Sequence, residues 1–181
     1  FRHVQANTAV AVDHPNVFGG DPAKEIQNLP YWILEYLRDK FLGKKDLKNL
    51  PKKFYIDRKD SKSNHRHLRK IINEKELTNF LKYRGFSIIT LSDLSFIDQV
   101  NLFHNASQII GLHGAGFANL TFCKPQTQII ELKPTSAGPV CGNLAEKLNL
   151  NYHDISVEPL ENSNNQQGFI NIPLNLLEKK L

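Results

Sequence analysis

The chemistry that this sequence could perform is the binding of an anion, and the residues that indicate it form a glycine-rich turn. The run GLHGAG at residues 111–116 stands between a predicted strand and a predicted helix. Small residues let the backbone approach a ligand closely, and the free N–H groups at the start of a helix attract negative charge. His113 could donate a hydrogen bond to a phosphate oxygen. The alternative is a tight packing turn in which His113 bonds to a backbone carbonyl group.

Charged side chains that could complete such a site follow other predicted strands. Arg58 comes directly after one strand, and Arg66 and Arg69 follow eight and eleven residues later. A planar guanidinium fork suits the paired oxygens of a diphosphate. For each arginine alone the alternative is a solvated surface charge, which is the favoured interpretation of Arg66. Glu131 ends an apolar strand, where it could accept hydrogen bonds from two ribose hydroxyl groups or pair with a neighbouring lysine.

Alternating strands and helices predict how these residues are positioned. Apolar runs predict strands at 4–12, 53–57, 86–91, 108–112, 127–132 and 152–155. Helical spacing predicts helices at 29–42, from Asn73 to Gly85, from Ser95 onward, and at 140–148. Asn73 is expected to form a capping pair with Glu76, and Phe96 is expected on a buried helix face. The chain after 157 is expected to be mostly loop before a short element near 174–177.

This order of elements predicts an α/β fold. It is typical of a Rossmann-like parallel sheet with helices on both faces. Ligands of such sheets bind beyond the carboxyl ends of the strands. Arg58, the segments 91–93 and 113–116, and Glu131 all fall at those ends.

Composition narrows the class of protein. The chain has 181 residues, 40% of them hydrophobic, which is enough for one domain with its own core. No apolar run approaches the roughly 20 residues of a membrane helix. The chain begins at Phe1 without a leader, so we expect a piece of a longer protein. Cys123 and Cys141 make no disulfide framework and the histidines show no metal-ligand spacing, so we expect a reduced, cytoplasmic setting and no metal.

The positive charge of the chain is concentrated in one segment. Residues 44–70 hold eleven basic and three acidic side chains, a net charge of +8. Such a segment attracts phosphate-bearing ligands, although a solvated basic loop explains it equally well. Nucleic acid is the other candidate partner. It is disfavoured because the two aromatic residues of the segment, Phe54 and Tyr55, fall in a predicted strand and form no stacking platform.

Taken in order, these motifs resemble a known family. The resemblance rests on Tyr55-Ile56-Asp57-Arg58, Arg69-Lys70-Ile71-Ile72-Asn73-Glu74, Gly85-Phe86, Leu91-Ser92-Asp93-Leu94-Ser95-Phe96 with Gln99, and the stretch from Gly111 to Asn119 followed by Ile130-Glu131-Leu132. Together they are similar to the family 61 glycosyltransferases, over residues 53–133 closely and 10–42 loosely. That family includes β-linked N-acetylglucosaminyl- and xylosyltransferases and many bacterial polysaccharide enzymes.

The resemblance implies the donor half of a GT-B-like enzyme, which has two Rossmann-like domains. Residues 1–28 would end a preceding domain, 29–156 would form the donor-binding domain, and 157–181 would be a C-terminal tail. The implied activity is an inverting transfer of sugar from a UDP-sugar to a hydroxyl group of a polysaccharide or other glycan acceptor. The N-terminal domain of the same enzyme would be a further partner.

The resemblance also implies roles for individual residues. Asn73 would order the arginine loop and Glu131 would face the ribose. Leu91, Asp93 and Leu94 would border the base. The diphosphate would be held by Arg58, Arg69, His113, Gly114, Ala115 and Gly116.

Two questions stay open at the level of sequence. No Asp-x-Asp pair stands in a suitable loop, so donor binding is expected to need no metal cofactor. No base for the acceptor hydroxyl group is evident. The alternative functions are a non-catalytic nucleotide-binding module and nucleic-acid binding through segment 44–70.

Overall fold

The computed structural model describes residues 8, 20–43, 49–59, 69–160 and 168–181. Nearly all of the strand predicted at 4–12 lies outside the described residues, as do Arg66 and the basic stretches at 44–48 and 60–68.

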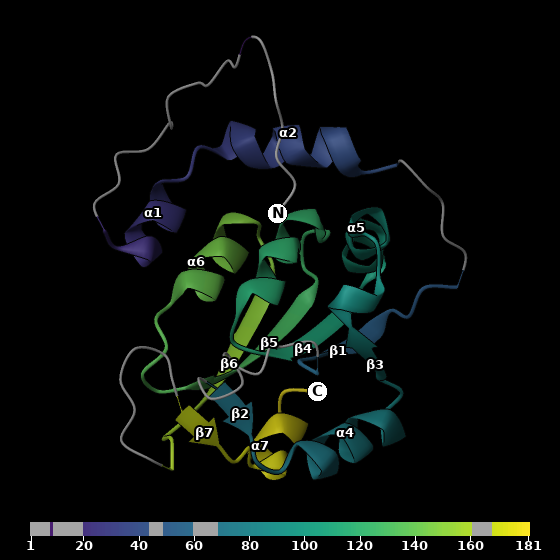
Figure 1. Cartoon of the computed structure of the whole chain (residues 1–181), viewed down its shortest axis with the longest axis vertical. Helices are drawn as coiled ribbons and strands as arrows, with labels where there is room; N and C mark the ends of the chain where they lie inside the picture. Colours follow the sequence, from purple (N-terminus) through teal and green to yellow (C-terminus); the bar gives the residue numbers. More distant parts are fainter. Residues whose placement is uncertain (1–7, 9–19, 44–48, 60–68, 161–167) are drawn as a thin grey trace.

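A five-stranded parallel sheet forms the centre of the molecule (Figure 1). Its strands stand in the order β3-β1-β4-β5-β6, and their bounds are Lys53–Asp57 for β1, Ser87–Thr90 for β3, Gln108–Leu112 for β4, Gln128–Pro134 for β5 and Asn151–Val157 for β6. The chain first moves from β1 to β3 at one edge and then returns to β4 on the other side of β1. The strand order therefore reverses between β1 and β4, where Ile56 pairs with Gly111. The predicted parallel sheet is confirmed.

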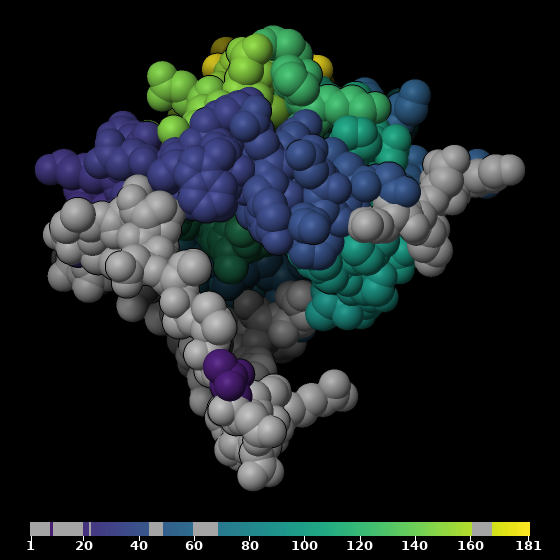
Figure 2. All heavy atoms as spheres, turned by 90° about the horizontal axis from the view of Figure 1, so that it is seen from above, coloured from purple at the N-terminus to yellow at the C-terminus, as the bar shows by residue number. Residues whose placement is uncertain are grey.

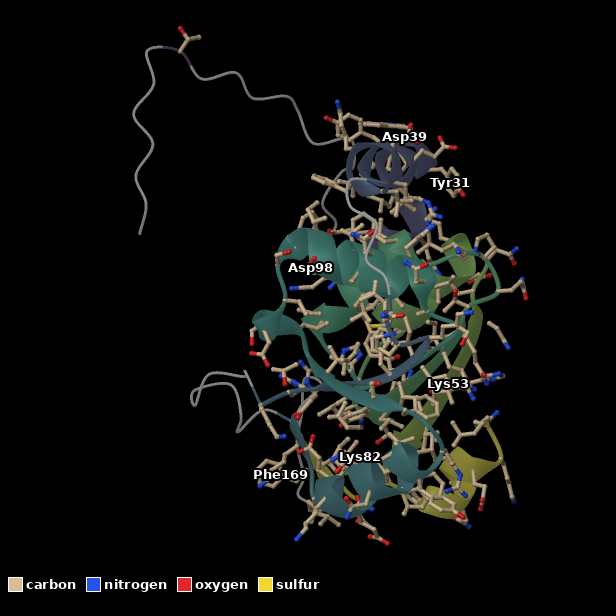
Figure 3. The ribbon with its side chains drawn as sticks, turned by 90° about the vertical axis from the view of Figure 1, so that its right-hand side faces the viewer. Tyr31, Asp39, Lys53, Lys82, Asp98 and Phe169 are labelled. Carbon is tan, nitrogen blue, oxygen red and sulfur yellow. The ribbon has the colours of Figure 1, made fainter. Side chains whose placement is uncertain are left out.

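Helices cover both faces of this sheet (Figure 1). One face carries α1 (Pro22–Asn28), α2 (Tyr31–Phe41), α5 (Phe96–Asn105), the 3₁₀ helix η2 (Ala115–Phe122) and α6 (Val140–Lys147). The other face carries α4 (Glu74–Tyr83), α7 (Leu174–Glu178) and a small parallel pair, β2 (Arg69–Ile71) with β7 (Gly168–Ile170). Figure 3 shows the layers from the side, with Tyr31 and Asp39 on α2 at one end and Lys82 on α4 at the other.

Side chains that alternate along β1 explain the two covered faces. Phe54 and Ile56 pack into the core under α2 and α5, while Tyr55 packs into the core under α4 and α7. Successive side chains of a strand point to opposite faces of a sheet. Because helices cover both faces here, all three side chains are buried. A strand buried on both faces reads as a continuous apolar run, which is the pattern expected of a doubly covered parallel sheet.

Local sequence signals explain where two helices begin and end. The Ser95 hydroxyl group accepts the backbone N–H of Asp98 and starts α5 as predicted. Gly85 follows α4 with a φ of +80°, a conformation that glycine adopts without steric cost. The expected burial of Phe96 is wrong, because its side chain is 49% exposed. Its ring nevertheless contacts the rings of Phe41 and Phe122 edge-on, at the margin of the core.

The helix α2 is fixed to the body of the protein by one arginine. Nη1 of Arg38 donates to the carbonyl oxygens of Thr121 at 2.7 Å and Cys123 at 2.8 Å. These two carbonyl groups lie at the C-terminal end of η2, where no backbone N–H of the helix is available to bond to them. The Arg38 guanidinium group supplies the missing donors. Figure 2 looks down on α2, which lies across this face of the molecule. Among the described residues, no helix combines the length and apolar character needed to cross a membrane.

The C-terminal segment is more ordered than the sequence predicted. Nδ2 of Asn73 donates to the carbonyl oxygen of Ile172 at 2.9 Å, and Oδ1 of Asn73 accepts the N–H of Ile172 at 2.9 Å. The predicted capping pair of Asn73 with Glu76 is therefore wrong, because the amide is already bonded to the C-terminal segment and makes no cap. The loop expected before residue 174 includes the strand β7, and Ile170 and Leu177 are fully buried. The division at 28 and 156 stays a prediction.

We expect Asn73→Ala to weaken the attachment of the C-terminal segment. The variant leaves two backbone groups of the buried Ile172 without their partner and should lower the free energy of unfolding by about 1–3 kcal/mol. Urea unfolding measures the loss. Asn79→Ala, an exposed asparagine on the same α4, is the matched control and should stay within about 0.5 kcal/mol of the unaltered protein. Equal stability of the two variants would contradict this role of Asn73.

Candidate functional site

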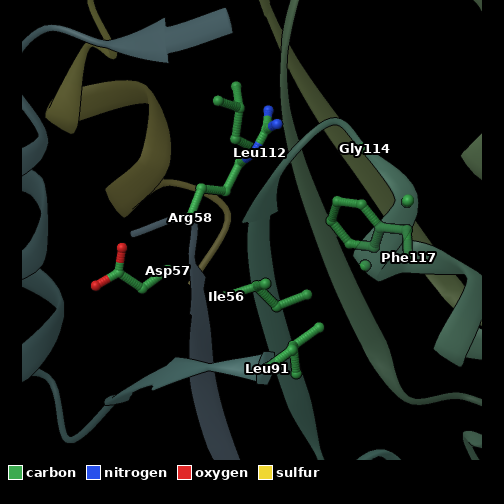
Figure 4. Close-up of a pocket in the computed structure, with 9 residues that line it drawn as sticks. Ile56, Asp57, Arg58, Leu91, Leu112, Gly114 and Phe117 are labelled. Carbon is green, nitrogen blue, oxygen red and sulfur yellow. The ribbon is translucent and has the colours of Figure 1, made fainter. Parts of the chain in front are cut away.

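A cavity of about 200 Å³ lies at the point where the strand order reverses (Figure 4). It is bounded by the carboxyl ends of β1 and β4 and by the turns that follow them, as expected for ligand sites in such sheets. The residues that line it are Ile56, Asp57, Arg58, Leu91, Leu112, Gly114, Ala115, Gly116 and Phe117. Five of these were predicted as site residues from the sequence: Arg58, Leu91, Gly114, Ala115 and Gly116.

Arg58 reaches across the cavity toward the glycine turn. A Cβ atom on Gly114 would lie 3.9 Å from Cζ and Nη1 of Arg58. The preceding Asp57 stabilises this path of the chain, because its carboxylate accepts the backbone N–H of Lys59 and binds Nζ of the same residue, both at 3.0 Å. Figure 4 shows the Asp57 carboxylate turned away from Gly114 and Phe117. The turn after β1 thus directs the guanidinium group, and not the carboxylate, toward the glycines.

Arg69 brings a second guanidinium group close to the first. It is half-buried at the start of β2. Burial and the positive charge of Arg58 lower the pKa of Arg69, against the opposing influence of Cys141 and Glu131. Two partly buried guanidinium groups repel each other, and an anion that binds beside them would offset that repulsion. The structure therefore brings Arg58 and the glycine turn together at the cavity, while Arg69 does not line the cavity and is linked to Arg58 through their charges.

The glycines of the turn serve two different purposes. A Cβ atom on Gly111 would lie 3.2 Å from Cβ of Ile56 and from Cζ of Phe117, and one on Gly116 would lie 3.1 Å from Cδ1 of Leu91. These two glycines permit close packing. Gly114 has room for a methyl group, since its nearest neighbour would be the Leu112 carbonyl oxygen at 3.8 Å. The tight packing considered from the sequence is therefore confirmed for Gly111 and Gly116, although the His113 ring binds Glu131 and not a backbone carbonyl group. Anion binding at the turn stays a prediction.

His113 and Glu131 lie behind the cavity and not on its surface. Nδ1 of His113 hydrogen-bonds to Oε1 of Glu131, and the hydroxyl group of Tyr152 donates to Oε2 of Glu131. Glu131 is 0% exposed. The lysine pairing considered for Glu131 is not formed, because the neighbouring Lys133 binds Asp154 at 3.1 Å. Contact of Glu131 with a ribose stays a prediction, and in this structure protein groups hold both carboxylate oxygens.

The electrostatic state of Glu131 follows from these bonds. Burial by itself would raise the pKa of this carboxyl group. The hydrogen bonds from His113 and Tyr152 outweigh burial and leave the pKa below its ordinary value. Glu131 is therefore a buried carboxylate that carries a charge at neutral pH.

The other predicted site residues lie off the cavity. Leu91 lines it, but Asp93 is exposed and Leu94 packs against the core. Asn73 binds Ile172, as described above. The assignment of Asp93, Leu94 and Asn73 to ligand binding stays a prediction.

One glutamine positions the segment that carries Leu91. Nε2 of Gln99 donates to the carbonyl oxygens of Leu91 at 2.9 Å and Leu94 at 3.3 Å. Asn119 donates to Oε1 of Gln99 at 3.1 Å. The short 3₁₀ helix η1 (Leu91–Asp93) is thus connected to η2 through Gln99.

Sequence reasoning did not find all the residues of the site. Ile56, Leu112 and Phe117 form its apolar wall and are direct neighbours of predicted residues, so the strand ends could have indicated them. Tyr152 lies 21 residues from Glu131, its partner on the adjacent strand. No local pattern marks that pairing, because it depends on the register of β5 and β6.

One group of side chains offers metal-ligand chemistry. Ligand atoms of His113, Glu131 and Cys141 lie within 4.8 Å of one another, and all three residues are buried. Burial and the charge of Glu131 raise the pKa of the Cys141 thiol well above its ordinary value. Since zinc binds the thiolate, the group in this state is a hydrogen-bonded network. The absence of a metal cofactor stays a prediction.

The fold is an α/β domain with a five-stranded parallel sheet, compatible with a Rossmann-like arrangement, and its cavity lies at the strand-order reversal. The sequence model of one family, Glycosyltransferase 61, matches residues 7–130, which is more than half of the chain. The chain belongs to this glycosyltransferase family, and the sequence-based recognition is confirmed.

Individual proteins that are similar to the chain also carry the names of glycosyltransferases. The chain is 38% identical over 69 residues to the EGF domain-specific O-linked N-acetylglucosamine transferases of Bos taurus and Mus musculus, and 36% identical to that of Gallus gallus. These matches cover 35% of this chain and 13% of the length of each relative.

We expect alanine to separate the two kinds of glycine. Gly111→Ala should lower the free energy of unfolding by about 1–3 kcal/mol, because its methyl group would press against Ile56 and Phe117 in the core. Gly114→Ala should leave stability nearly unchanged. Denaturant unfolding makes the comparison. Gly138→Ala is the control, since no atom lies within 4 Å of its added methyl group. Equal losses at 111 and 114 would contradict the division of roles.

Proposed function

We propose that this chain forms the donor-binding part of an inverting glycosyltransferase, which moves a sugar from a UDP-sugar to a hydroxyl group of a glycan or other acceptor. The observation that carries the proposal is the cavity between β1 and β4, where Arg58 faces Gly114 and Arg69 lies near. Family membership supports glycosyl transfer as the reaction. The donor nucleotide, the stereochemistry and the GT-B arrangement belong to the proposal.

The charges and the size of the cavity support a diphosphate as its occupant. Two guanidinium groups match two linked phosphates in charge and can each bind oxygens in pairs. The cavity, at about 200 Å³, is smaller than the roughly 300–1,000 Å³ of sites that enclose a whole ligand. It therefore suits one portion of a nucleotide sugar, with Leu91 and Phe117 offering apolar surface beside it.

The proposed reaction is a direct displacement at the anomeric carbon. The acceptor oxygen forms a bond to that carbon while the bond from the carbon to the phosphate oxygen breaks, and UDP leaves with the electron pair. Arg58, Arg69 and the backbone N–H groups that start η2 would stabilise the charge that grows on the diphosphate. A base removes the proton of the acceptor hydroxyl group, and we assign no residue of this chain to that role.

The relatives indicate which donor to try first. Their names give N-acetylglucosamine as the sugar and EGF domains as the acceptor of those proteins. UDP-N-acetylglucosamine is therefore the first donor to test. Because the matched segment is 13% of each relative, the acceptor and the cytoplasmic setting stay predictions for this chain.

We expect the chain to bind UDP more tightly than UMP without a metal ion. Each additional phosphate adds charge-assisted hydrogen bonds with the two arginines, which are stronger than neutral hydrogen bonds. Calorimetric titration of UDP and UMP, in EDTA and then in Mn²⁺, measures both effects. Equal affinities for UDP and UMP would contradict a diphosphate site. Binding that appears only with Mn²⁺ would contradict the metal-independent part of the proposal.

Arg58→Ala should weaken UDP binding by about 10- to 100-fold, the loss that corresponds to a hydrogen bond with a charged group. The fold should stay intact, because Arg58 is only half-buried and follows the end of β1. Calorimetry gives the affinity and circular dichroism checks the fold. Lys82→Ala is the control, since it removes one positive charge from an exposed position on α4. An unchanged UDP affinity in Arg58→Ala would show that the phosphates bind elsewhere.

A further inference from the structure

A row of hydrogen-bonded side chains crosses three neighbouring strands behind the cavity. Tyr152 from β6 donates to Glu131 on β5, and Glu131 binds His113 at the end of β4. We propose that Tyr152 and Glu131 are positioning residues, which hold His113 and the adjoining glycine turn in the geometry that binds the phosphates. This inference rests on the proposed function.

The register of the sheet makes this row continuous. Glu131 pairs with Gly111 on β4, and Ile129 pairs with Tyr152 on β6. The carboxylate therefore lies between the end of β4 and the ring of Tyr152. That ring is held from its other side by α6, where a Cβ atom on Gly142 would come within 3.1 Å of Cε1 of Tyr152. A ring packed this closely presents its hydroxyl group in one direction.

The hydrogen bond to Glu131 determines which ring nitrogen of His113 carries a hydrogen atom. A carboxylate can only accept hydrogen bonds, so Nδ1 of His113 must carry a hydrogen atom to bind it. Tyr152 retains its hydroxyl proton, because burial and the hydrogen bond to Glu131 raise its pKa well above the ordinary value. Both oxygens of Glu131 thus accept a hydrogen bond, and the imidazole ring is fixed in orientation and tautomer.

The row reaches the cavity through the turn itself. The backbone N–H of His113 donates to the carbonyl oxygen of Leu132 at 2.8 Å, which joins the turn to β5. Sγ of Cys141 lies 3.7 Å from Nδ1 of His113, and the next residue, Gly114, lines the cavity. A fixed His113 therefore fixes the direction of the backbone at Gly114.

Glu131 also acts on the arginines. Its negative charge favours the charged form of Arg69, while Arg58 and burial oppose that form. The carboxylate is fully buried and does not line the cavity. As an isolated charge it would repel a diphosphate, so any benefit to binding must come from the positions that it imposes.

The two possible roles of Glu131 predict opposite changes in UDP affinity. Glu131→Gln keeps a hydrogen-bond acceptor and removes the charge. If Glu131 acted only as a charge, the variant would bind UDP more tightly. If Glu131 positions the turn, the variant should bind UDP about 3- to 10-fold more weakly, the loss of one ordinary hydrogen bond. Calorimetric titration of UDP decides between the two signs, and tighter binding would overturn the proposal.

Tyr152→Phe tests the same row without a change of charge. The ring and its packing stay, and only the hydrogen bond to Glu131 is lost. We expect UDP affinity to fall about 3- to 10-fold while UMP affinity changes by less than about twofold, so the ratio of the two affinities should fall. The unfolding midpoint should fall in either case, because the buried carboxylate loses a partner. A merely structural role would lower both affinities to the same extent, and that result would overturn the proposal. Tyr83→Phe, at a side chain that is 89% exposed, is the matched control.

A spectroscopic measurement keeps this inference separate from the proposed function. ¹⁵N NMR of the ligand-free protein, assigned with a His113→Gln variant, reports which ring nitrogen of His113 carries hydrogen. We expect Nδ1–H in the unaltered protein and in Tyr152→Phe. Hydrogen on Nε2 alone would overturn the positioning role, whether or not UDP binds. If Nδ1–H is found and UDP fails to bind, the proposed donor is wrong and the hydrogen-bonded row stands.

Discussion

The reversal of strand order between β1 and β4 is the constraint on which the site depends. The chain leaves β1 toward one edge of the sheet and continues from β4 toward the other, so the turns after these two strands diverge. A cavity opens where they separate. The close approach of Gly111 to Ile56 and Phe117 keeps the two strands and η2 together at that point. A Cβ atom at this position would lie 3.2 Å from both Ile56 and Phe117, so a larger residue would crowd this contact.

The balance of charge around the cavity is the second organising feature. The charges of the partly buried Arg58 and Arg69 affect each other, and the carboxylate of Glu131 is fully buried away from the cavity lining. A buried charge is stable only when it is paired and hydrogen-bonded. His113 and Tyr152 meet that condition for Glu131. Arg58 lines the cavity, where an anionic ligand would meet the same condition for its charge.

Much of the fold could be predicted from the sequence because its signals are local. Apolar runs marked the five main strands, and Ser95 and Gly85 marked helix ends. The rule for parallel sheets then placed Arg58 and the glycine turn together. Local signals failed where a side chain had a distant partner. Asn73 resembled a helix cap but binds Ile172, and no local pattern indicated the bond between Glu131 and Tyr152. Those partners depend on strand register and on the path of the C-terminal segment.

The C-terminal segment, which the sequence presented as a tail, helps to place the second arginine. Arg69 begins β2, and β2 has one partner strand among the described residues, β7, in which Gly168 pairs with Arg69. Two residues beyond β2, the side-chain amide of Asn73 binds Ile172. The segment 69–73 is therefore bonded to residues 168–172 at both of its ends. An isolated three-residue strand has too few hydrogen bonds to stay ordered alone. The position of Arg69 near Arg58 is therefore a product of the whole chain, from β1 at one end to α7 at the other.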